Sequence, residues 1–453
     1  MTAVIAKSNM TVIVGLGLTG LSVARYLAAQ GRQFMVVDTR AEPPNLQRFR
    51  TEFPGVACEL GGLNRETLCA AAEIILSPGM ALTEVEIAAA CAARVPIIGD
   101  IELFSRTVQA PVIAITGSNA KSTVTTLVGE MARLAGKKVA VGGNLGTPAL
   151  DLLSDDIDLY VVELSSFQLE TTHRLNARVA TILNVTEDHL DRYDSMTRYH
   201  AAKQRIYFGA QQVVVNRDDI LTHPPLAKGT EVFSFGCGEP DKNGFGLRLE
   251  NRGQGEQEFI AFEFEPLMPV QEVAMRGRHN LINALSALAL GHAAGLPMDA
   301  MLEALRKFQG LPHRCQWVAE KGGVEFFNDS KATNVGATLA AIRGLARSPA
   351  KLVLIAGGES KGADFNSLSG DLRKNVRTVV VIGSDWGKIA AVADKVTQVV
   401  HATDMKEAVA SAFAAAKPGD AVLLSPACAS FDMFKNYEDR GQNFIETVEG
   451  LRK

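Results

Sequence analysis

Short apolar runs alternate with amphipathic segments along almost the whole chain. Runs such as Val112–Thr116 and Leu159–Glu163 have the length and the uninterrupted apolar character of strands that are buried on both faces. Segments such as Leu18–Gln30 instead repeat their apolar residues with a helical period. The other predicted elements are the strands Thr11–Val14, Phe34–Val37, Ile74–Leu76, Ile97–Ile98, Lys138–Val141, Val179–Asn184, Val213–Asn216, Val324–Asn328, Lys351–Gly357, Thr378–Gly383, Gln398–His401 and Ala421–Ser425, and the helices Val124–Ala135 and Asn280–Ala294. Strands that alternate with helices predict an α/β fold with mostly parallel sheets.

Two interruptions divide this pattern into three α/β series. The first lies near Arg106–Pro111 and the second at Gly310–Pro312, where Gly and Pro are typical of a hinge. We therefore predict an N-terminal Rossmann-like domain over 1–106, a central domain over 107–311 and a C-terminal Rossmann-like domain over 312–453. Residues 228–270 are polar, Gly-rich and weakly alternating, which predicts a small β excursion within the central domain.

Composition limits the function without identifying it. Of the 453 residues, 47% are hydrophobic, far above the content of a disordered chain, and the net charge of −4 disfavours nucleic-acid binding driven by bulk charge. The six cysteines form no C-x-x-C pair, and Met1–Lys7 lacks the apolar core of a signal peptide, so we expect a reduced, cytoplasmic protein. The least charged stretch, Leu281–Met298, contains polar residues and a Gly-Leu-Pro break, which predicts a buried helix and no membrane span.

A glycine-rich turn follows the first predicted strand. Gly15, Gly17 and Gly20 open the next helix, and Asp38 ends the second strand. Glycines in this arrangement let the backbone approach a pyrophosphate at a helix N-terminus, while the acid can bind a ribose. Taken alone, the motif favours an NAD enzyme, but another nucleotide diphosphate and a turn without a ligand both stay open.

A second phosphate-binding pattern follows strand Val112–Thr116. Residues 116–123 read Thr-Gly-Ser-Asn-Ala-Lys-Ser-Thr. In such a loop the backbone N–H groups hold phosphate oxygens, Lys121 would reach the β and γ phosphates, and Ser122 would bind Mg²⁺. The strict pattern is not met, because Ala120 precedes the lysine, and a capped helix start is the alternative. An oxidoreductase has no use for a second, ATP-type loop, which weakens the NAD hypothesis.

Polar residues gather at the ends of the next strands. Glu163 ends a predicted strand, where α/β proteins display ligands, and His189 lies in the polar loop after strand Val179–Asn184. Mg²⁺ prefers oxygen ligands, which Ser122 and Glu163 can supply. A lone histidine is more often structural, and a helical lysine such as Lys203 is usually solvated, so these two need context before a role is assigned.

A series of ordered motifs across nearly the whole chain resembles the Mur ligase family. The motifs are Gly15–Gly20, Asp38–Arg40, Ser77–Gly79, Gly142–Gly146, Glu163–Gln168, Asp188–Tyr193, Ala201–Lys203, His279–Ala284, Leu311–Arg314, Asn328–Asn334, Gly357–Lys361 and Ser425–Ser430. Of these, Ser330–Asn334 and Ser425–Ser430 are similar to the branch that adds D-glutamate. The resemblance implies an ATP-dependent ligase of cytoplasmic peptidoglycan precursor synthesis. It would join D-glutamate to UDP-N-acetylmuramoyl-L-alanine through an acyl phosphate, releasing ADP and phosphate.

The resemblance also implies which residues serve each substrate. The first domain would bind UDP through Gly15, Gly17, Leu18, Thr19, Asp38, Thr39, Arg40 and Gly79, with help from Asn144 of the central domain. The central domain, similar to a P-loop ATPase, would bind ATP through Gly117, Ser118, Asn119, Ala120, Lys121, Ser122, Thr123 and Asn283, with Arg314 and Asp329 of the third. The third domain would bind D-glutamate through Lys331, Thr333, Lys361, Ser430 and Tyr437. The catalytic residues would be Lys121, Glu163, His189 and Lys203.

The resemblance further implies two Mg²⁺ ions. Ser122 and Glu163 would hold the first, and His189 with Lys203 the second. Because an ammonium repels Mg²⁺, Lys203 is expected to carry a CO₂-derived carbamate. The family pattern has Gly where this chain has Ala120, and the added methyl is tolerable if residue 120 does not take a positive φ. We expect a monomer whose partners are small-molecule substrates.

Three other functions stay open. A related ligase such as a folylpolyglutamate synthase would lack the UDP-type first domain. An NAD oxidoreductase with an appended NTPase-like domain would bind NADH. A nucleotide-binding regulator without catalysis would be expected to lack Glu163, His189 and Lys203 as a set, and all three are present.

Overall fold

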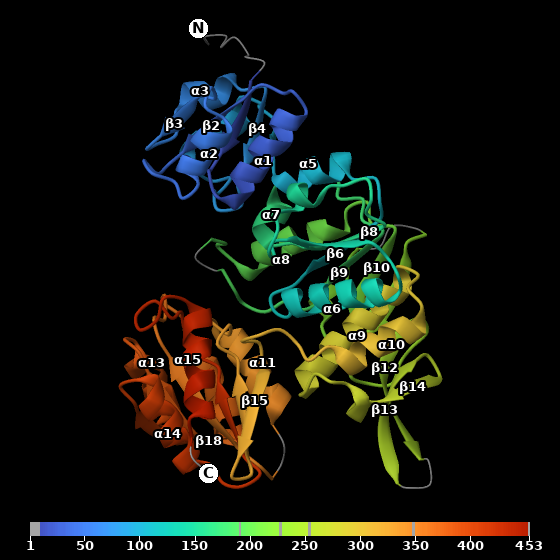
Figure 1. Ribbon diagram of the computed structural model, residues 1–453, viewed down its shortest axis with the longest axis vertical. Helices are drawn as coiled ribbons and strands as arrows, with labels where there is room; N and C mark the ends of the chain where they lie inside the picture. Colours follow the sequence, from blue (N-terminus) through green and yellow to red (C-terminus); the bar gives the residue numbers. More distant parts are fainter. Residues whose placement is uncertain (1–9, 190–191, 226–228, 252–254, 347–348, 452–453) are drawn as a thin grey trace.

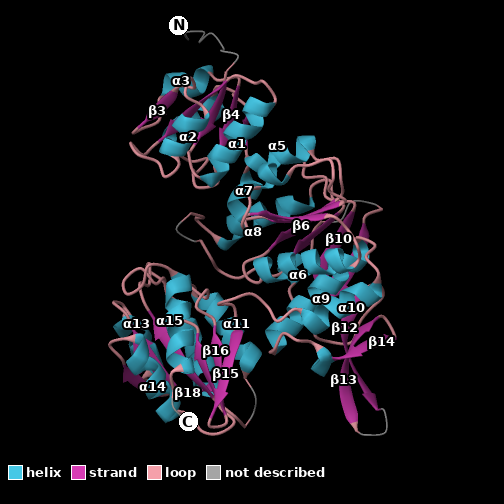
Figure 2. Cartoon of the chain, viewed as in Figure 1, coloured by secondary structure: helices cyan, strands magenta, loops and turns pink. Residues whose placement is uncertain are grey.

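Three α/β units follow one another along the chain (Figure 1). The computed structural model describes residues 10–189, 192–225, 229–251, 255–346 and 349–451, so Met1–Lys7 lies outside the described residues. Figure 2 shows helices packed against each of the three sheets. The predicted α/β class with three domains is confirmed, while the boundaries at residues 106 and 311 stay predictions.

The first sheet has five parallel strands in the order β3-β2-β1-β4-β5. Its elements are β1 Thr11–Val14, α1 Leu18–Ala29, β2 Phe34–Asp38, α2 Leu46–Glu52, β3 Cys58–Leu60, α3 Arg65–Ala70, β4 Glu73–Leu76, α4 Val85–Ala92, β5 Ile97–Ile98 and α5 Asp100–Thr107. All residues of the central strand β1 are buried, as its apolar run predicts. Because parallel strands end at one edge, the loops after β1, β2 and β4 lie together there.

The central sheet has nine strands in the order β14-β13-β12-β11-β10-β9-β6-β8-β7. Its elements are β6 Val112–Thr116, α6 Lys121–Leu134, β7 Val139–Gly143, η1 Ala149–Leu152, β8 Leu159–Glu163, α7 Ser166–Glu170, β9 Val179–Ile182, α8 Met196–Gln204, η2 Arg205–Tyr207, β10 Gln212–Asn216, η3 Ile220–Thr222, β11 Glu231–Phe235, β12 Gly244–Asn251, β13 Glu256–Phe262, β14 Glu265–Pro269, η4 Val270–Glu272, α9 Arg278–Ala293 and α10 Met298–Lys307. Strands β7 to β12 pair in parallel, and the antiparallel β12–β14 meander is the predicted β excursion. Helix α9 is largely buried, and no helix in the described part of the chain is long and apolar enough to cross a membrane.

The third sheet has the order β15-β16-β20-β17-β18-β19, and only β15 pairs antiparallel. Its elements are β15 Gln316–Lys321, β16 Val324–Asn328, α11 Val335–Leu345, β17 Leu352–Gly357, η5 Asn366–Leu368, α12 Ser369–Asn375, β18 Val376–Ile382, α13 Trp386–Ala393, β19 Gln398–His401, α14 Met405–Ala415, β20 Ala421–Leu424 and α15 Tyr437–Glu449. Two apolar clusters cover its two faces, and both draw their members from the described residues after Arg314.

One apolar cluster instead runs from the first domain into the central one. It contains Ile13 of β1 together with Ala114 of β6, and Phe104 of α5 meets Tyr160 of β8 edge-on at a centroid distance of 5.4 Å. Full burial of one such side chain stabilises a fold by about 1.5–3 kcal/mol. The first two domains are therefore packed into one unit.

Asp100 begins α5 at this junction and is enclosed by it. Its Oδ2 accepts a hydrogen bond from Gln168 Nε2 at 3.1 Å, and among the described residues its Oδ1 has no partner. Burial raises the pKa of Asp100 from 3.8 to about 6, so the junction favours the protonated carboxyl.

We expect this carboxyl to make stability fall as pH rises. Below pH 4 Asp100 is protonated in folded and unfolded chains alike, whereas above pH 6 folding must bury its charge, which costs about 3 kcal/mol for a shift of two units. Asp100→Asn should remove this decline. Between pH 4.5 and 7.5 the free energy of unfolding of the variant, measured with urea, should therefore rise relative to that of the unmodified chain. The exposed Asp155→Asn should show no such gain, and parallel pH profiles for Asp100→Asn and the unmodified chain would contradict the prediction.

Candidate active site

The loop between β6 and α6 is held in shape by the loop after β9. The N–H of Ser118 donates to the carbonyl of Asn184 at 2.9 Å, and Ser118 Oγ donates to the carbonyl of Thr186 at 2.9 Å. Lys121 Nζ lies across the loop and donates to the carbonyls of Gly117 and Ser118 at 2.8 and 3.0 Å. The loop thus places a cation, N–H groups and the start of α6 at one point, which is the arrangement of a phosphate site.

Ala120 stands in this loop with φ of +68°, in the left-handed region. The condition under which its methyl would be harmless is therefore not met. An L-residue in this region is strained by about 1–2 kcal/mol. The loop keeps its shape because the bonds to Asn184 and Thr186 over-determine it.

Glu163 ends β8 beside the loop and is 2% exposed. Its Oε1 accepts from Asn144 Nδ2 at 2.6 Å, and its buried Oε2 has no hydrogen-bond partner among the described residues. An unpaired buried carboxylate oxygen fits a cation. The structure finds no cluster of three His, Cys, Asp or Glu side chains for a metal among the described residues. A Mg²⁺ ion that keeps its waters and shares substrate phosphates fits this sparse donor set.

Lys203 on α8 is buried opposite Glu163. Its Nζ donates to the carbonyl of Gly117 at 2.9 Å and lies 4.5 Å from the centre of the Tyr199 ring. Burial, and then the charge of Lys121, hold the pKa of Lys203 well below its usual value. Burial also lowers the pKa of Lys121, against the opposing charge of Glu163. The solvated helix lysine that is usual in proteins is thus excluded for Lys203.

His189 has a positive φ of +54° and a half-exposed side chain. Its Nε2 lies 3.7 Å from Asp188 Oδ2, and its ring meets the Phe167 ring at a centroid distance of 4.8 Å. The neighbouring motif residue Asp191 lies outside the described residues. Phe167 holds the imidazole at the mouth of the site.

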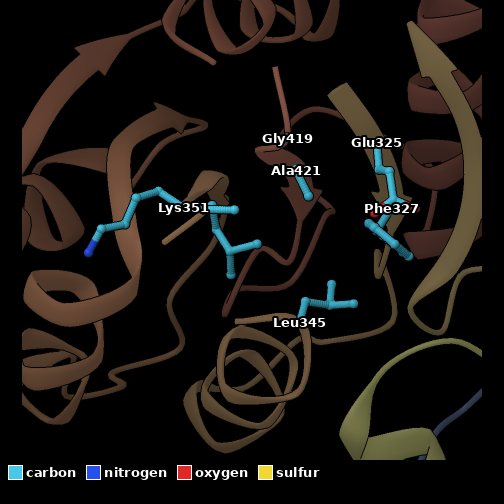
Figure 3. Close-up of a pocket in the computed structure, with 8 residues that line it drawn as sticks. Glu325, Phe327, Leu345, Lys351, Gly419 and Ala421 are labelled. Carbon is cyan, nitrogen blue, oxygen red and sulfur yellow. The ribbon is translucent and has the colours of Figure 1, made fainter. Parts of the chain in front are cut away.

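Of these groups, Lys121, His189 and Lys203 line one cavity of about 240 Å³. Its lining residues are Lys121, Asn144, Ser165, Ser166, Phe167, His189, Tyr199 and Lys203. Figure 3 shows another pocket, at the amino-terminal edge of the third sheet between Glu325, Leu345 and Ala421, where the Lys351 side chain points away from the other labelled residues. That pocket encloses about 10 Å³, room for about one water, which excludes a substrate.

The third domain reaches this site through Arg314. Its Nη2 donates to Ser122 Oγ at 2.9 Å, which joins the start of the third domain to the phosphate loop. Asp329, after β16, accepts from Ser425 Oγ and from the Cys315 N–H, and burial raises its pKa to about 7. Asn283 lies on α9, where its amide donates to Asn280 of the same helix.

The residues expected to bind D-glutamate gather at the carboxyl edge of the third sheet. Lys331 Nζ lies 3.8 Å from the centre of the Tyr437 ring, and burial, followed by the charge of Arg314, lowers the pKa of Lys331. Ser430 is buried, whereas Thr333 and Lys361 are exposed.

Sequence reasoning missed Arg440, which supports this edge from α15. Its buried guanidinium donates to Ser330 Oγ and to the carbonyls of Ser330, Cys428 and Ala429. The only sequence signal for it is an arginine on an amphipathic helix, which is an ordinary surface pattern. Phe167 and Tyr199 were also missed, because aromatic residues usually belong to the core.

The first domain presents its candidate residues at the carboxyl edge of its own sheet. Gly15 has φ of +97°, and a Cβ there would lie 2.8 Å from Ser77, so only glycine fits. The Asp38 carboxylate accepts from the Leu16 N–H at 2.7 Å and from the Arg40 guanidinium at 2.7 and 2.9 Å. These bonds engage both oxygens of Asp38, which therefore anchors the turn and Arg40.

The other candidate residues of this domain line the same edge: Gly17, Leu18 and Thr19 follow β1, Thr39 follows β2 and Gly79 follows β4. Leu18 is 63% exposed there. Asn144, in contrast, lies in the central cavity beside Glu163.

Sequence profiles of known families match most of the chain. They are described as "Mur ligase MurD-like, N-terminal domain" over residues 9–99, "Mur ligase middle domain" over 115–291 and "Mur ligase, glutamate ligase domain" over 313–428. The chain belongs to the Mur ligase family. A relative from Pseudomonas fluorescens, named UDP-N-acetylmuramoylalanine--D-glutamate ligase, is 57% identical over 450 residues, 99% of this chain and 100% of the relative. Ligases of the same name from Pseudomonas aeruginosa and Hahella chejuensis are 57% and 50% identical over the same shares of both chains.

Solved structures of Mur-type ligases share the fold. A UDP-N-acetylmuramate-alanine ligase from Thermotoga maritima matches 97% of this chain and 99% of its own with a TM-score of 0.56 at 20% identity. A pseudomurein peptide ligase from Methanothermus fervidus matches 98% of this chain and 100% of its own with a TM-score of 0.56 at 18% identity. These matches cover nearly the whole chain, so the likeness in fold extends over all three domains.

We expect Ala120→Gly to stabilise the protein by about 1 kcal/mol, because glycine removes the strain of the left-handed conformation. The KM for ATP should change less than about 2-fold, since the loop already has its shape. Urea unfolding and steady-state kinetics measure the two effects. As a control, Ala88→Gly on the exposed face of α4 should destabilise by about 1 kcal/mol. A loss of stability in Ala120→Gly would contradict the prediction.

Proposed function

We propose that this Mur ligase joins D-glutamate to UDP-N-acetylmuramoyl-L-alanine and converts ATP to ADP and phosphate. The observation that carries the proposal is the meeting of two domains at the phosphate loop. Lys121, Glu163 and Lys203 come from the central domain, and Arg314 arrives from the third domain to bond Ser122. The names of the full-length relatives support the choice of substrates.

The first step brings two anions together, because the substrate carboxylate attacks the γ-phosphate. A bond forms between the carboxylate oxygen and phosphorus, the bond to the bridging oxygen of ADP breaks, and an acyl phosphate results. Lys121 and Arg314 lie where they would offset this repulsion and stabilise the charge on the transferring group. Of the candidate ATP residues, Asn283 and Asp329 would act on the nucleoside side.

Mg²⁺, when bound, supplies Lewis-acid stabilisation of the phosphate oxygens. The unpaired Oε2 of Glu163 and the hydroxyl of Ser122 would hold a first ion, and His189 with a modified Lys203 a second. Asn144 would orient Glu163 through the bond to its Oε1.

Lys203 would serve as a carbamate. Its depressed pKa favours the neutral amine, whose lone pair attacks CO₂. A C–N bond forms, one C=O π bond becomes the carboxylate, and the amine loses a proton. The product places an anion near Lys121, whose charge disfavours the ammonium of Lys203.

The second step needs the amine of D-glutamate beside the acyl phosphate. The amine attacks the acyl carbon, and the tetrahedral intermediate expels phosphate. Lys331, Thr333, Lys361, Ser430 and Tyr437 would hold the two carboxylates of the amino acid. They lie on the third domain, so this domain must close over the phosphate loop about Gly310–Pro312 before attack. We place this reaction in the cytoplasm, on small molecules, with the chain as a monomer.

An NAD enzyme fits the first domain poorly. The acid that would bind a ribose, Asp38, is already engaged by the Leu16 N–H and by the Arg40 guanidinium. A related ligase with another acceptor remains the alternative that kinetics must separate.

We expect phosphate release from ATP to require both UDP-N-acetylmuramoyl-L-alanine and D-glutamate. L-Glutamate, L-lysine and L-alanine should each give less than about 1% of that rate, because their groups miss the paired contacts of the acceptor site. A coupled phosphate assay measures the rates. Release driven by another amino acid would overturn the substrate, and binding of NADH detected by fluorescence would favour an oxidoreductase.

We expect Lys203→Ala to lower kcat at least 100-fold, because an anion that positions the metal is lost. Adding acetate or formate should restore part of the activity, since a short carboxylate can replace the carbamate in the space left. Lys121→Ala is the matched control: it should be as slow but should not respond to carboxylates. Equal responses of the two variants, or full activity of Lys203→Ala, would contradict the carbamate.

A further inference from the structure

Arg192 packs against Phe167, which lines the active-site cavity, and is used by none of the steps above. Its side chain is 15% exposed and sits between the first domain and α7 of the central domain. The sequence gives no hint of this, because the residues that it contacts lie 22 and 112 positions away.

On one side Arg192 contacts the first domain. Its Nη2 donates to the carbonyl of Met80 at 2.8 Å, and its Nη1 lies 3.5 Å from the carbonyl of Gly79. These carbonyls belong to the loop after β4, which also carries Ser77, the residue packed against Gly15 of the glycine turn. The guanidinium is therefore hydrogen-bonded to the loop that borders the proposed UDP site.

On the other side Arg192 contacts α7, the helix that follows Glu163. Its Nη2 donates to Glu170 at 2.9 Å, and its guanidinium carbon lies 4.8 Å from the centre of the Phe167 ring. Phe167 lines the cavity, and its ring also contacts the His189 ring. The same side chain is thus tied to the wall of the reaction site.

The backbone of Arg192 completes the connection. Its N–H donates at 3.0 Å to the carbonyl of His189, the residue with the positive φ. One residue therefore links the UDP-side loop, the cavity wall and the turn that carries the imidazole. Lysine does not reproduce this, since an ammonium lacks the second nitrogen that lies near the Gly79 carbonyl and the planar group that packs over the Phe167 ring.

We propose that Arg192 is a positioning residue that sets the distance between the UDP site and the reaction site. This rests on the proposed function, in which one substrate is held by its nucleotide in the first domain while its carboxylate reacts in the central domain. A long substrate anchored at one end reacts well only if the two sites are held at its own length, because small misplacements of the reacting atoms are costly. Arg192 acts through the frame and does not touch the reacting groups.

The test compares the whole substrate with a fragment that lacks the uridine, 1-phospho-N-acetylmuramoyl-L-alanine. With the whole substrate, Arg192→Lys should lower kcat/KM about 30-fold, with the KM for ATP within about 2-fold. With the fragment, which has no nucleotide in the first domain, the same variant should lose less than about 3-fold. Glu170→Gln weakens the contact with Arg192 and keeps the size of the Glu170 side chain, so it should also lower kcat/KM for the whole substrate. This second variant still tests the proposal if Arg192→Lys does not fold.

Asp151→Ala is the matched control. Asp151 also joins the first two domains, accepting from Ser22 at 2.7 Å and from Arg25 at 3.5 Å, but among the described residues its side chain accepts no hydrogen bond from the loop after β4 or from α7. Its kcat/KM for the whole substrate should change less than about 3-fold. Equal losses on whole substrate and fragment, or an equal loss in Asp151→Ala, would overturn the role of Arg192. Absence of D-glutamate-dependent phosphate release by the unmodified chain would instead overturn the proposed function.

Discussion

The crowding of positive charge at one point is the constraint on which this molecule depends. Lys121, Lys203 and Arg314 meet around the phosphate loop, and the buried carboxylate beside them is that of Glu163. Placing these cations inside the protein opposes folding: burial lowers the pKa of both lysines, and the charge of a neighbouring cation lowers each pKa further. The rigid parallel sheets can hold these cations together, because they fix the loops that extend from their carboxyl edges. Binding of anions then relieves the repulsion between the cations.

Much of the fold could be predicted, because buried parallel strands are read as uninterrupted apolar runs. Strands β6, β8 and β16 have the predicted bounds. The edge strands β3 and β15 could not be found, since Cys58–Leu60 and Gln316–Lys321 are partly exposed and carry polar residues. Helix α6 begins at Lys121, three residues before the first residue of its apolar stripe. In each of these places the element depends on contacts with a neighbouring strand or loop, which the local pattern of residues does not contain.

The site divides in the same way. Motifs could assign Lys121, Glu163 and Lys203 to one site, since their side chains carry recognisable chemistry. They could not show that Ala120 takes a positive φ, because that conformation is imposed by bonds from the loop after β9. Nor could they show that the Asp38 carboxylate accepts hydrogen bonds from Leu16 and Arg40. Pairings between distant segments belong to the folded chain and leave no local trace in composition or spacing.

The apolar cluster around Phe104 and Tyr160 has a consequence for domain motion. Three freely jointed domains would have two independent hinges, but this cluster removes one of them. The remaining freedom is a single swing of the third domain, whose own clusters are separate in the described residues. A swing that seats Arg314 on Ser122 also covers the phosphate loop. The bond between Arg314 and Ser122 therefore marks one position of this single swing, because the first two domains move together.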